Sequence, residues 1–168
     1  LATILTYSPK PLVLDADALT AISEDRQLLE RLPAGCILTP HMKEFDRLFG
    51  HHDHWWARIQ TAKEKAKRHR LVIILKNRYT FIVPPEGRVL INPTGNAAMA
   101  TGGSGDVLTG ILVALLAQQY APQDAAVLGC YIHGAAGDQL AGDGMAVIPA
   151  GQLIRQIPTV MGAFGDHG

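Results

Sequence analysis

Short apolar runs alternate with amphipathic stretches along this chain, and the alternation predicts strands and helices in turn. Three apolar runs, at 11–15, 36–39 and 71–75, are typical of buried parallel strands. Helical spacing predicts one helix at 24–32 with Ser23 as its cap and a second at 42–49 that ends at Gly50. A third helix is expected after Asp53, which would cap it. One face of that helix carries apolar or small side chains: Trp55, Trp56, Ile59, Ala62 and Ala66.

The second half of the chain contains a predicted hairpin, a glycine-rich loop and three further helices. The hairpin pairs 80–83 with 88–91 around a turn at 84–87. Beyond the loop, helices are expected at 105–118, at 124–141 and after Pro149. Strands that alternate with helices indicate an α/β fold with a mostly parallel sheet covered on both faces. The 168 residues are enough for one domain with a hydrophobic core.

The composition is that of an ordinary globular protein and narrows the possible partners. Hydrophobic residues make up 48% of the sequence, and 15 basic residues balance 15 acidic ones. A neutral chain lacks the basic excess of a nucleic-acid-binding protein, and no apolar stretch is long enough to span a membrane. Cys36 and Cys130 lie in apolar runs, which predicts small buried side chains in a reducing, cytoplasmic compartment. Because Leu1 opens the chain without an initiator Met or a targeting signal, we expect a piece of a longer protein.

The segment 92–110 concentrates the residues from which a phosphate site can be built. Gly102, Gly103 and Gly105 let the backbone turn sharply and approach a ligand closely. The helix that begins here leaves unpaired N–H groups at its positive end, which favours an anion such as phosphate, and the Ser104 hydroxyl is a further donor. Neither the P-loop pattern nor the dinucleotide-binding fingerprint matches, because no Lys-Ser/Thr pair follows the glycines and their spacing differs.

Asp106 directly follows the last of these glycines and is the predicted catalytic base. In the first turn of a helix the dipole stabilises an ionised carboxylate. Such a carboxylate would repel a bound phosphate, but it is well placed to accept a proton from a hydroxyl that attacks the phosphate. The alternative is that Asp106 is only a helix-terminal charge and that the glycines form only a tight turn.

Four motifs, in order along the chain, resemble those of the ADP/ATP-dependent NAD(P)H-hydrate dehydratases, which belong to the ribokinase-like superfamily. They are the DADAL stretch at 15–19, Thr39-Pro40-His41 with Glu44, the 75–80 stretch where the family has a KGxxT adenylate-binding loop, and 94–96 with 100–110. The resemblance implies a ribokinase-like three-layer αβα fold with a mostly parallel central sheet. Residues 1–168 would be the later portion of that dehydratase domain, with the N-terminal part of the domain missing from this chain.

The same resemblance implies an activity, in which ADP or ATP phosphorylates the ring hydroxyl of hydrated NADH or NADPH and phosphate then leaves. Asp106 would take the hydroxyl proton and, with His41, would contact the hydrated dinucleotide. The implied anion hole consists of Gly102, Gly103, Ser104 and Gly105. The implied nucleotide site consists of Lys76, Asn77, Arg78, Tyr79, Thr80 and Gly105. Glu44 would hold Mg²⁺ through water, and we expect a homo-oligomer and a fused or associated NAD(P)H-hydrate epimerase.

Other functions stay open at this stage. A small-molecule kinase of the same superfamily, acting on a hydroxymethylpyrimidine, a thiazole alcohol or a sugar, would use the same base and anion hole. A non-catalytic nucleotide-binding module is the third possibility. Three positions also depart from the family pattern, since Asn77 and Ala98 stand where Gly is usual and Thr20 stands where Asn is expected.

Several polar residues outside the catalytic loop are expected to be structural. Asp15 and Asp17 could cap a helix or bind a metal ion, and we favour a structural role. The stretch 51–54 (HHDH) predicts an exposed loop and helix cap, because so local a cluster cannot surround a metal ion without a distant ligand. The charged run 63–70 predicts a solvated helix face, and His133 is expected to pack or pair within its helix.

Overall fold

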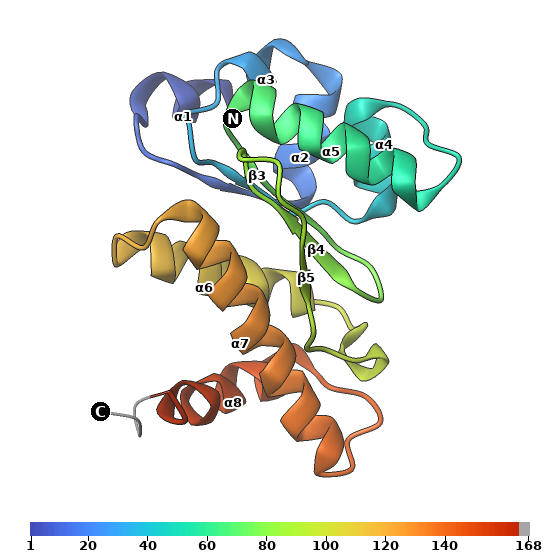
Figure 1. Ribbon diagram of the computed structural model, residues 1–168. Helices are drawn as coiled ribbons and strands as arrows, with labels where there is room; N and C mark the ends of the chain where they lie inside the picture. The colour runs from blue at the N-terminus through green and yellow to red at the C-terminus, as the bar shows by residue number, and fades with distance from the viewer. Residues whose placement is uncertain (165–168) are drawn as a thin grey trace.

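Five strands form one mixed sheet in the computed structural model, which describes residues 1–164 (Figure 1). They follow one another across the sheet in chain order: β1 (Val13–Leu14), β2 (Ile37–Leu38), β3 (Val72–Leu75), β4 (Thr80–Val83) and β5 (Leu90–Asn92). The first three strands are parallel, whereas β4 pairs antiparallel with both β3 and β5. The predicted hairpin is therefore present at one edge of the sheet, and its second strand begins at Leu90 rather than at residue 88.

Helices cover both faces of this sheet (Figure 1). On one side lie α1 (Ala2–Tyr7), α2 (Ala16–Glu24), α3 (Gln27–Glu30), α4 (Met42–Phe49) and α5 (Trp55–His69). On the other side, after the short 3-10 helix η1 (Ala97–Met99), lie α6 (Ser104–Ala117), α7 (Pro122–Gly142) and α8 (Ala150–Gly162).

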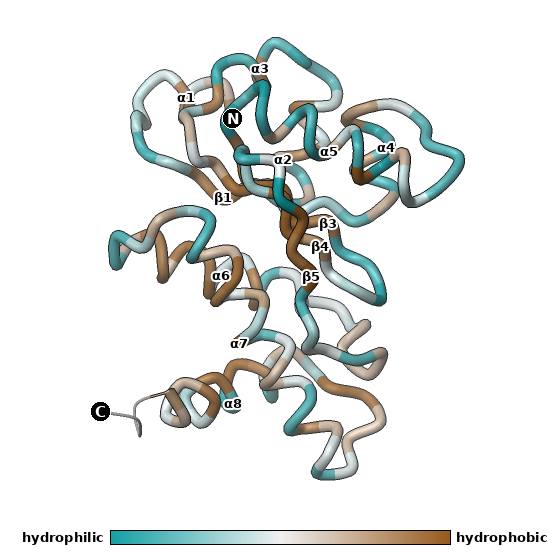
Figure 2. Tube along the Cα trace, viewed as in Figure 1, coloured by the Kyte–Doolittle hydropathy of each residue, from teal (hydrophilic) through white to brown (hydrophobic). Residues whose placement is uncertain are grey.

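Alternate side chains of the strands enter two separate cores. Val72 and Ile74 of β3 pack with α6 and α7, whereas Ile73 and Leu75 pack with α5. Figure 2 shows β1, β3 and β4 as a hydrophobic centre between the two helical layers. Because a strand buried on both faces needs apolar residues at every position, the unbroken aliphatic run at 71–75 follows from this geometry. The predicted three-layer α/β architecture is confirmed.

The prediction of one helix at 24–32 is wrong, because the chain forms α2 directly after β1 and only the short α3 beyond it. The Asp15 side chain caps α2, and Leu19 and Ile22 on one face of α2 are buried. Ser23, the predicted cap, lies inside α2 and donates its hydroxyl to the carbonyl of Thr20 at 2.7 Å. The acidic cap and the buried pair therefore outweigh the later leucines in deciding where the helix begins.

The remaining helices lie close to their predicted positions, with two corrections in α5. α4 has the predicted bounds, whereas α1 was not predicted. α5 is capped by His54 rather than Asp53, since His54 Nδ1 accepts a hydrogen bond from the Ala57 amide at 3.1 Å. Trp56 was expected on the packed face of α5 but is 68% exposed, whereas Trp55 packs against Phe81 with 5.5 Å between ring centroids.

His52 is buried, although an exposed loop was predicted there. Its Nδ1 lies 2.9 Å from Asp46 Oδ1, and its Nε2 lies 2.9 Å from Thr61 Oγ1. Arg58 donates to both carboxylate oxygens of Asp46. Burial acts to raise the pKa of Asp46, but the hydrogen bonds from Arg58 and His52 outweigh it and hold that pKa below its usual value. His52 therefore ties α4 to α5 rather than facing water.

Both cysteines are buried free thiols, as predicted. Burial raises the pKa of the Cys130 thiol to about 12, which keeps it protonated and unreactive at neutral pH. Of the helices within residues 1–164, none combines the length and the apolar character that crossing a membrane requires.

Candidate active site

Three polar residues gather where the parallel strands end. Asp15 follows β1, His41 lies just beyond β2, and Lys76 follows β3. His41 and Lys76 are paired across the sheet edge, and the Lys76 amide donates to the carbonyl of Pro40 at 2.9 Å. Since ligands of open α/β sheets bind at the carboxyl ends of the strands, this edge is the expected place for a functional site.

An ion pair joins this edge to the start of α6. Lys76 Nζ lies 2.9 Å from Asp15 Oδ1, and the Thr109 hydroxyl of α6 donates to Asp15 Oδ2 at 3.3 Å. A Cβ added at Gly105 would lie 3.4 Å from Asp15 Oδ2 and 3.6 Å from Lys76 Nζ. Burial acts to raise the pKa of Asp15, but the hydrogen bond and charge of Lys76 outweigh it and hold that pKa below its usual value.

Asp15 thus has the structural role that was favoured for it, as the N-cap of α2 and the partner of Lys76. Its Oδ1 also accepts from the Ala16 amide at 3.0 Å.

Ala16 has φ 44°, a left-handed conformation that is uncommon for a residue other than Gly. Such local strain is found where the surrounding contacts hold a functional group in place.

The glycine-rich loop turns into α6 directly in front of the Asp15–Lys76 pair. Gly103 is the N-cap of α6 with φ 85°, a backbone conformation that favours glycine. Gly105 and Asp106 lie in the first turn, where backbone N–H groups have no partner within the helix. Asp106 is exposed. The partial positive charge of the helix start and the Lys76 ammonium therefore lie side by side, which is the combination that binds a phosphate.

Ser104 has hydrogen-bond partners inside the protein. Its amide donates to the carbonyl of Thr101 at 3.3 Å, and its side chain is buried with Oγ 3.3 Å from His133 Nε2. His133 therefore pairs within the protein, as expected, and it does so with the start of α6. The role of Ser104 as an anion donor stays a prediction, as do the roles of Gly102, Gly103 and Gly105.

His41 and Glu44 form a reciprocal cap at the start of α4. His41 Nδ1 accepts from the amides of Lys43 and Glu44, and Glu44 Oε2 accepts from the His41 amide at 2.8 Å. Glu44 Oε1 lies 3.4 Å from His41 Nε2, and the His41 side chain is 52% exposed. The imidazole can therefore meet a ligand without leaving its place.

The donor set at this edge suits a hard cation that keeps most of its own water. Within residues 1–164, no three or more His, Cys, Asp or Glu side chains come together in a group that could hold a metal ion. Mg²⁺ is commonly bound through one or two carboxylates, waters and substrate phosphates, so a single carboxylate at Glu44 fits it. A Zn²⁺ site, which needs three or four protein ligands, does not fit.

The loop after β3 offers an exposed surface beside Lys76. Asn77, Arg78 and Tyr79 are exposed, and Arg78 Cζ lies 5.7 Å from the centroid of the Tyr79 ring. Thr80 begins β4. Lys76 is the residue through which this loop adjoins the start of α6.

Two residues that contact the site were given no role from the sequence. Thr109, which donates to Asp15, lies four residues after Gly105 and hence on the same face of α6, a spacing that could have indicated it. Asp138 of α7 accepts from the Gly95 amide at 2.9 Å and from Asn96 Nδ2 at 2.8 Å. No signal in the sequence connects Asp138 with a loop so far away in the chain.

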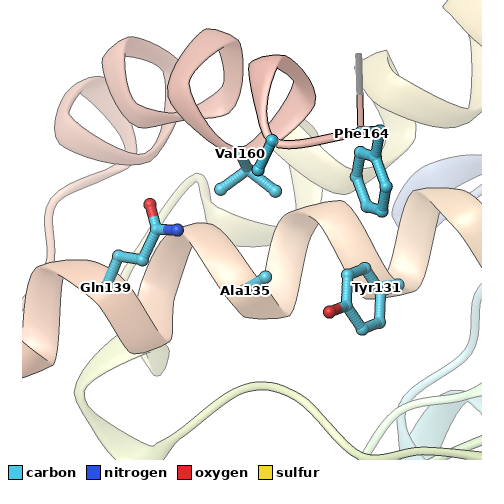
Figure 3. A pocket seen from close by; sticks show the side chains of 6 residues that line it. Tyr131, Ala135, Gln139, Val160 and Phe164 are labelled. Atoms are coloured by element: carbon cyan, nitrogen blue, oxygen red, sulfur yellow. The ribbon is translucent and has the colours of Figure 1, made fainter. Parts of the chain in front are cut away.

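The predicted site residues do not line the cavity drawn in Figure 3. That cavity, of about 380 Å³, lies between α7 and the end of α8, where Val160 and Phe164 face α7. Its lining is mostly apolar: Tyr131, Ala135, Gln139, Val160, Ala163 and Phe164. The strand edge and the start of α6 are therefore the part of the structure with the chemistry to act on a phosphate.

The family can be decided by comparison with known proteins. Residues 3–159 match the sequence profile of the NAD(P)H-hydrate dehydratase family. The chain belongs to that family. Of the relatives, the ADP-dependent (S)-NAD(P)H-hydrate dehydratase of Neisseria meningitidis is 41% identical over 166 residues, which are 94% of this chain and 54% of that protein. The bifunctional NAD(P)H-hydrate repair enzyme Nnr of Moorella thermoacetica is 44% identical over 158 residues, covering 90% of this chain and 29% of that protein.

Solved structures of the NAD(P)H-hydrate dehydratase family agree in fold. The ADP/ATP-dependent NAD(P)H-hydrate dehydratase of Bacillus subtilis, co-crystallised with ATP/Mg²⁺, gives a TM-score of 0.79 at 34% identity, over 96% of this chain and 57% of that one. A ribokinase-like superfamily protein of Enterococcus faecalis gives 0.80 at 29% identity, over 97% and 57%. The fold is therefore ribokinase-like, and the chain spans about half the length of these structures or of the Neisseria protein.

Proposed function

We propose that the protein carrying this chain dehydrates hydrated NADH or NADPH at the expense of ADP or ATP. The observation that carries the proposal is the exposed Asp106 carboxylate in the first turn of α6, directly after Gly105, which lies against Lys76. That arrangement offers a proton acceptor next to a phosphate-binding site. The names of the Neisseria and Bacillus relatives support the choice of substrates.

The chemistry proceeds in two stages. In the first, Asp106 accepts the proton of the ring hydroxyl while the hydroxyl oxygen attacks the terminal phosphorus of the nucleotide. The phosphoanhydride bond breaks, and AMP leaves from ADP or ADP from ATP. In the second, the new C–O bond to phosphate breaks with its electron pair on phosphate. Loss of a proton from the neighbouring ring carbon then restores the dihydronicotinamide double bond.

The chain supplies binding groups for the migrating phosphoryl group, the donor nucleotide and the hydrated dinucleotide. The amides at Gly102, Gly103 and Gly105, with Ser104 as a further donor, hold the migrating phosphoryl group as an anion hole. Lys76 and the 77–80 loop bind the donor nucleotide. His41, with its exposed imidazole, contacts the hydrated dinucleotide.

Glu44 would hold Mg²⁺ through water at the other end of the site. When bound, Mg²⁺ screens the charge of the nucleotide phosphates during transfer. The carboxylate is kept in place by the His41 amide, so it presents its remaining lone pairs without side-chain rearrangement.

The wider context of the chain is also part of this proposal. Residues 1–168 would belong to one ribokinase-like dehydratase domain, in a homo-oligomeric protein with a fused or associated NAD(P)H-hydrate epimerase. The name of the bifunctional Moorella relative supports a second activity in some family members. The cytoplasm is the compartment that suits two buried free thiols.

The test supplies the full-length protein with hydrated NADH, ADP and Mg²⁺ and follows the return of dihydronicotinamide absorbance. Asp106→Asn should lower kcat by about 10²–10⁴, the usual contribution of a general base, and should leave nucleotide affinity close to wild type. Asp124→Asn is the matched control, because Asp124 is also an acid in the first turn of a helix, α7.

Three results would count against the proposal. Wild-type protein that phosphorylates a vitamin-precursor alcohol or a sugar but restores no dihydronicotinamide is a kinase of the same superfamily. Wild-type protein that binds ADP without turning over any of these substrates is a binding module. Equal losses in Asp106→Asn and Asp124→Asn would show that Asp106 is only a helix-terminal charge.

A further inference from the structure

α7 packs directly on the segment that leads into the glycine-rich loop. A Cβ added at Gly134 would lie 2.2 Å from Thr94 Oγ1 and 2.8 Å from the Gly95 nitrogen. At Gly137 it would lie 2.1 Å from Met99 Sδ. Real Cβ atoms do not come this close, so the helix backbone and the loop are in contact only because both helix positions are glycine.

Asp138 holds the beginning of this segment. Its Oδ2 accepts from the Gly95 amide at 2.9 Å, and its Oδ1 accepts from Asn96 Nδ2 at 2.8 Å. Asn96 in turn caps η1, because its Oδ1 accepts from the Ala98 amide at 3.0 Å. Both oxygens of one α7 carboxylate are thus used on two consecutive loop residues.

His133 holds the end of the same segment. Its Nε2 lies 2.9 Å from the carbonyl oxygen of Ser104, the first residue of α6, and 3.3 Å from the hydroxyl of that residue. Burial lowers the pKa of His133, an effect that the hydrogen bond to Ser104 only partly offsets. The ring is therefore neutral at physiological pH, with its one N–H on Nε2 donating to Ser104.

We propose that His133 and Asp138 are positioning residues that hold the two ends of the 95–104 segment, and thereby the amides of the anion hole, at the distance phosphoryl transfer requires. The inference rests on the proposed function of the same site. Both residues come from one rigid helix, and neither occupies the opening in front of Gly105. Their effect on catalysis would pass entirely through the loop.

The kinetic test uses the full-length protein and three variants. Asp138→Asn places an N–H against a donor, and His133→Phe keeps a ring but removes the N–H. Each should lower kcat about a hundredfold, the cost of displacing reacting groups by about 1 Å, with KM for ADP close to wild type. His133→Gln, whose amide can donate to the Ser104 carbonyl, should recover most of the lost kcat.

Asp143→Asn is the matched control, because Asp143 is the C-cap of the same helix. It should keep wild-type kinetics. Wild-type turnover in folded Asp138→Asn and His133→Phe would overturn the proposal. So would a loss of kcat that follows a loss of thermal stability, with His133→Gln no better than His133→Phe, since that pattern belongs to a merely structural role.

A second measurement separates this inference from the proposed function. Hydrogen–deuterium exchange of peptides covering 94–104 needs no substrate, and it should be faster in Asp138→Asn and His133→Phe than in wild type or Asp143→Asn. Unchanged exchange in both variants overturns the positioning role, whatever reaction the protein catalyses. Wild-type protein without dehydratase activity overturns the proposed function and leaves the exchange result to decide the positioning.

Discussion

Replacing Gly105 by Ala separates what the fold requires at this position from what a ligand requires. Gly105 does not have a positive φ. A Cβ there would meet Asp15 Oδ2 at 3.4 Å and Lys76 Nζ at 3.6 Å, which are ordinary van der Waals contacts. Nothing within residues 1–164 therefore excludes a methyl group at this position. If glycine is required, the requirement comes from a molecule that approaches the backbone.

Gly105→Ala should change stability little but turnover strongly. The free energy of unfolding should stay within about 1 kcal/mol of wild type, since Ala is favoured over Gly in helices by about that amount and no overlap opposes it. Turnover of hydrated NADH should fall at least about a hundredfold, because the methyl group would lie where the phosphoryl group meets the amides. Removal of one such donor typically costs about 10²–10³ in kcat.

Urea unfolding and turnover, measured on the same preparations of full-length protein, give both quantities. Gly103→Ala is the informative contrast, because φ there is +85° and a Cβ would lie 3.0 Å from Ala150 Cβ. That variant should lose about 1–2 kcal/mol of stability as well as activity. A stable Gly105→Ala protein with wild-type turnover would refute the phosphate site at the start of α6.

Three further predictions follow from contacts around the site. Gly134→Ala should destabilise the protein in thermal melts, because overpacking against Thr94 costs about 1–3 kcal/mol and the helix-propensity gain of about 1 kcal/mol only partly offsets it. Lys76→Met should cost about 1–3 kcal/mol, between an exposed and a buried ion pair. In acid titrations the stability difference between wild type and Lys76→Met should shrink as the pH falls, because the depressed pKa of Asp15 makes wild type lose the ion-pair stabilisation on protonation, whereas the variant has none to lose. Since burial lowers the pKa of His133, wild-type stability should decline as pH falls below about 6.5, and His133→Phe should flatten part of that decline.

Features set by near neighbours in sequence could be predicted well. α4 is bounded by the reciprocal cap of His41 and Glu44 and by Gly50, all local signals, and its predicted range is correct.

α2 was missed because its position depends on a contact between residues far apart in the sequence. Its start depends on Asp15, whose carboxylate is oriented by Lys76, a residue 61 positions away in sequence. A pattern of leucines cannot report a contact of that kind.

The same distinction applies to the candidate site. The glycines and Asp106 could be found because the signal lies within a few residues. The contacts that bring Lys76 and Thr109 to Asp15 cross 61 and 94 positions, and those from Asp138 to the loop cross 42 and 43. Such separations carry no periodicity, so only the folded chain reveals which polar residues share one edge.

The departures from the family pattern fall where the folded chain makes no demand for the usual residue. Among the described residues other than glycine, positive φ values occur at Ala16, Arg70 and Gln119, so neither Asn77 nor Ala98 needs glycine's conformational freedom. The Thr20 hydroxyl accepts from Arg47 at 3.3 Å and so links α2 to α4. Gly103, by contrast, has a backbone that demands glycine, and there the sequence keeps it. Within the 94–96 and 100–110 motifs, the two glycines with positive φ, Gly95 and Gly103, both match the family pattern, which is the relation expected if the loop conformation itself is what binds phosphate.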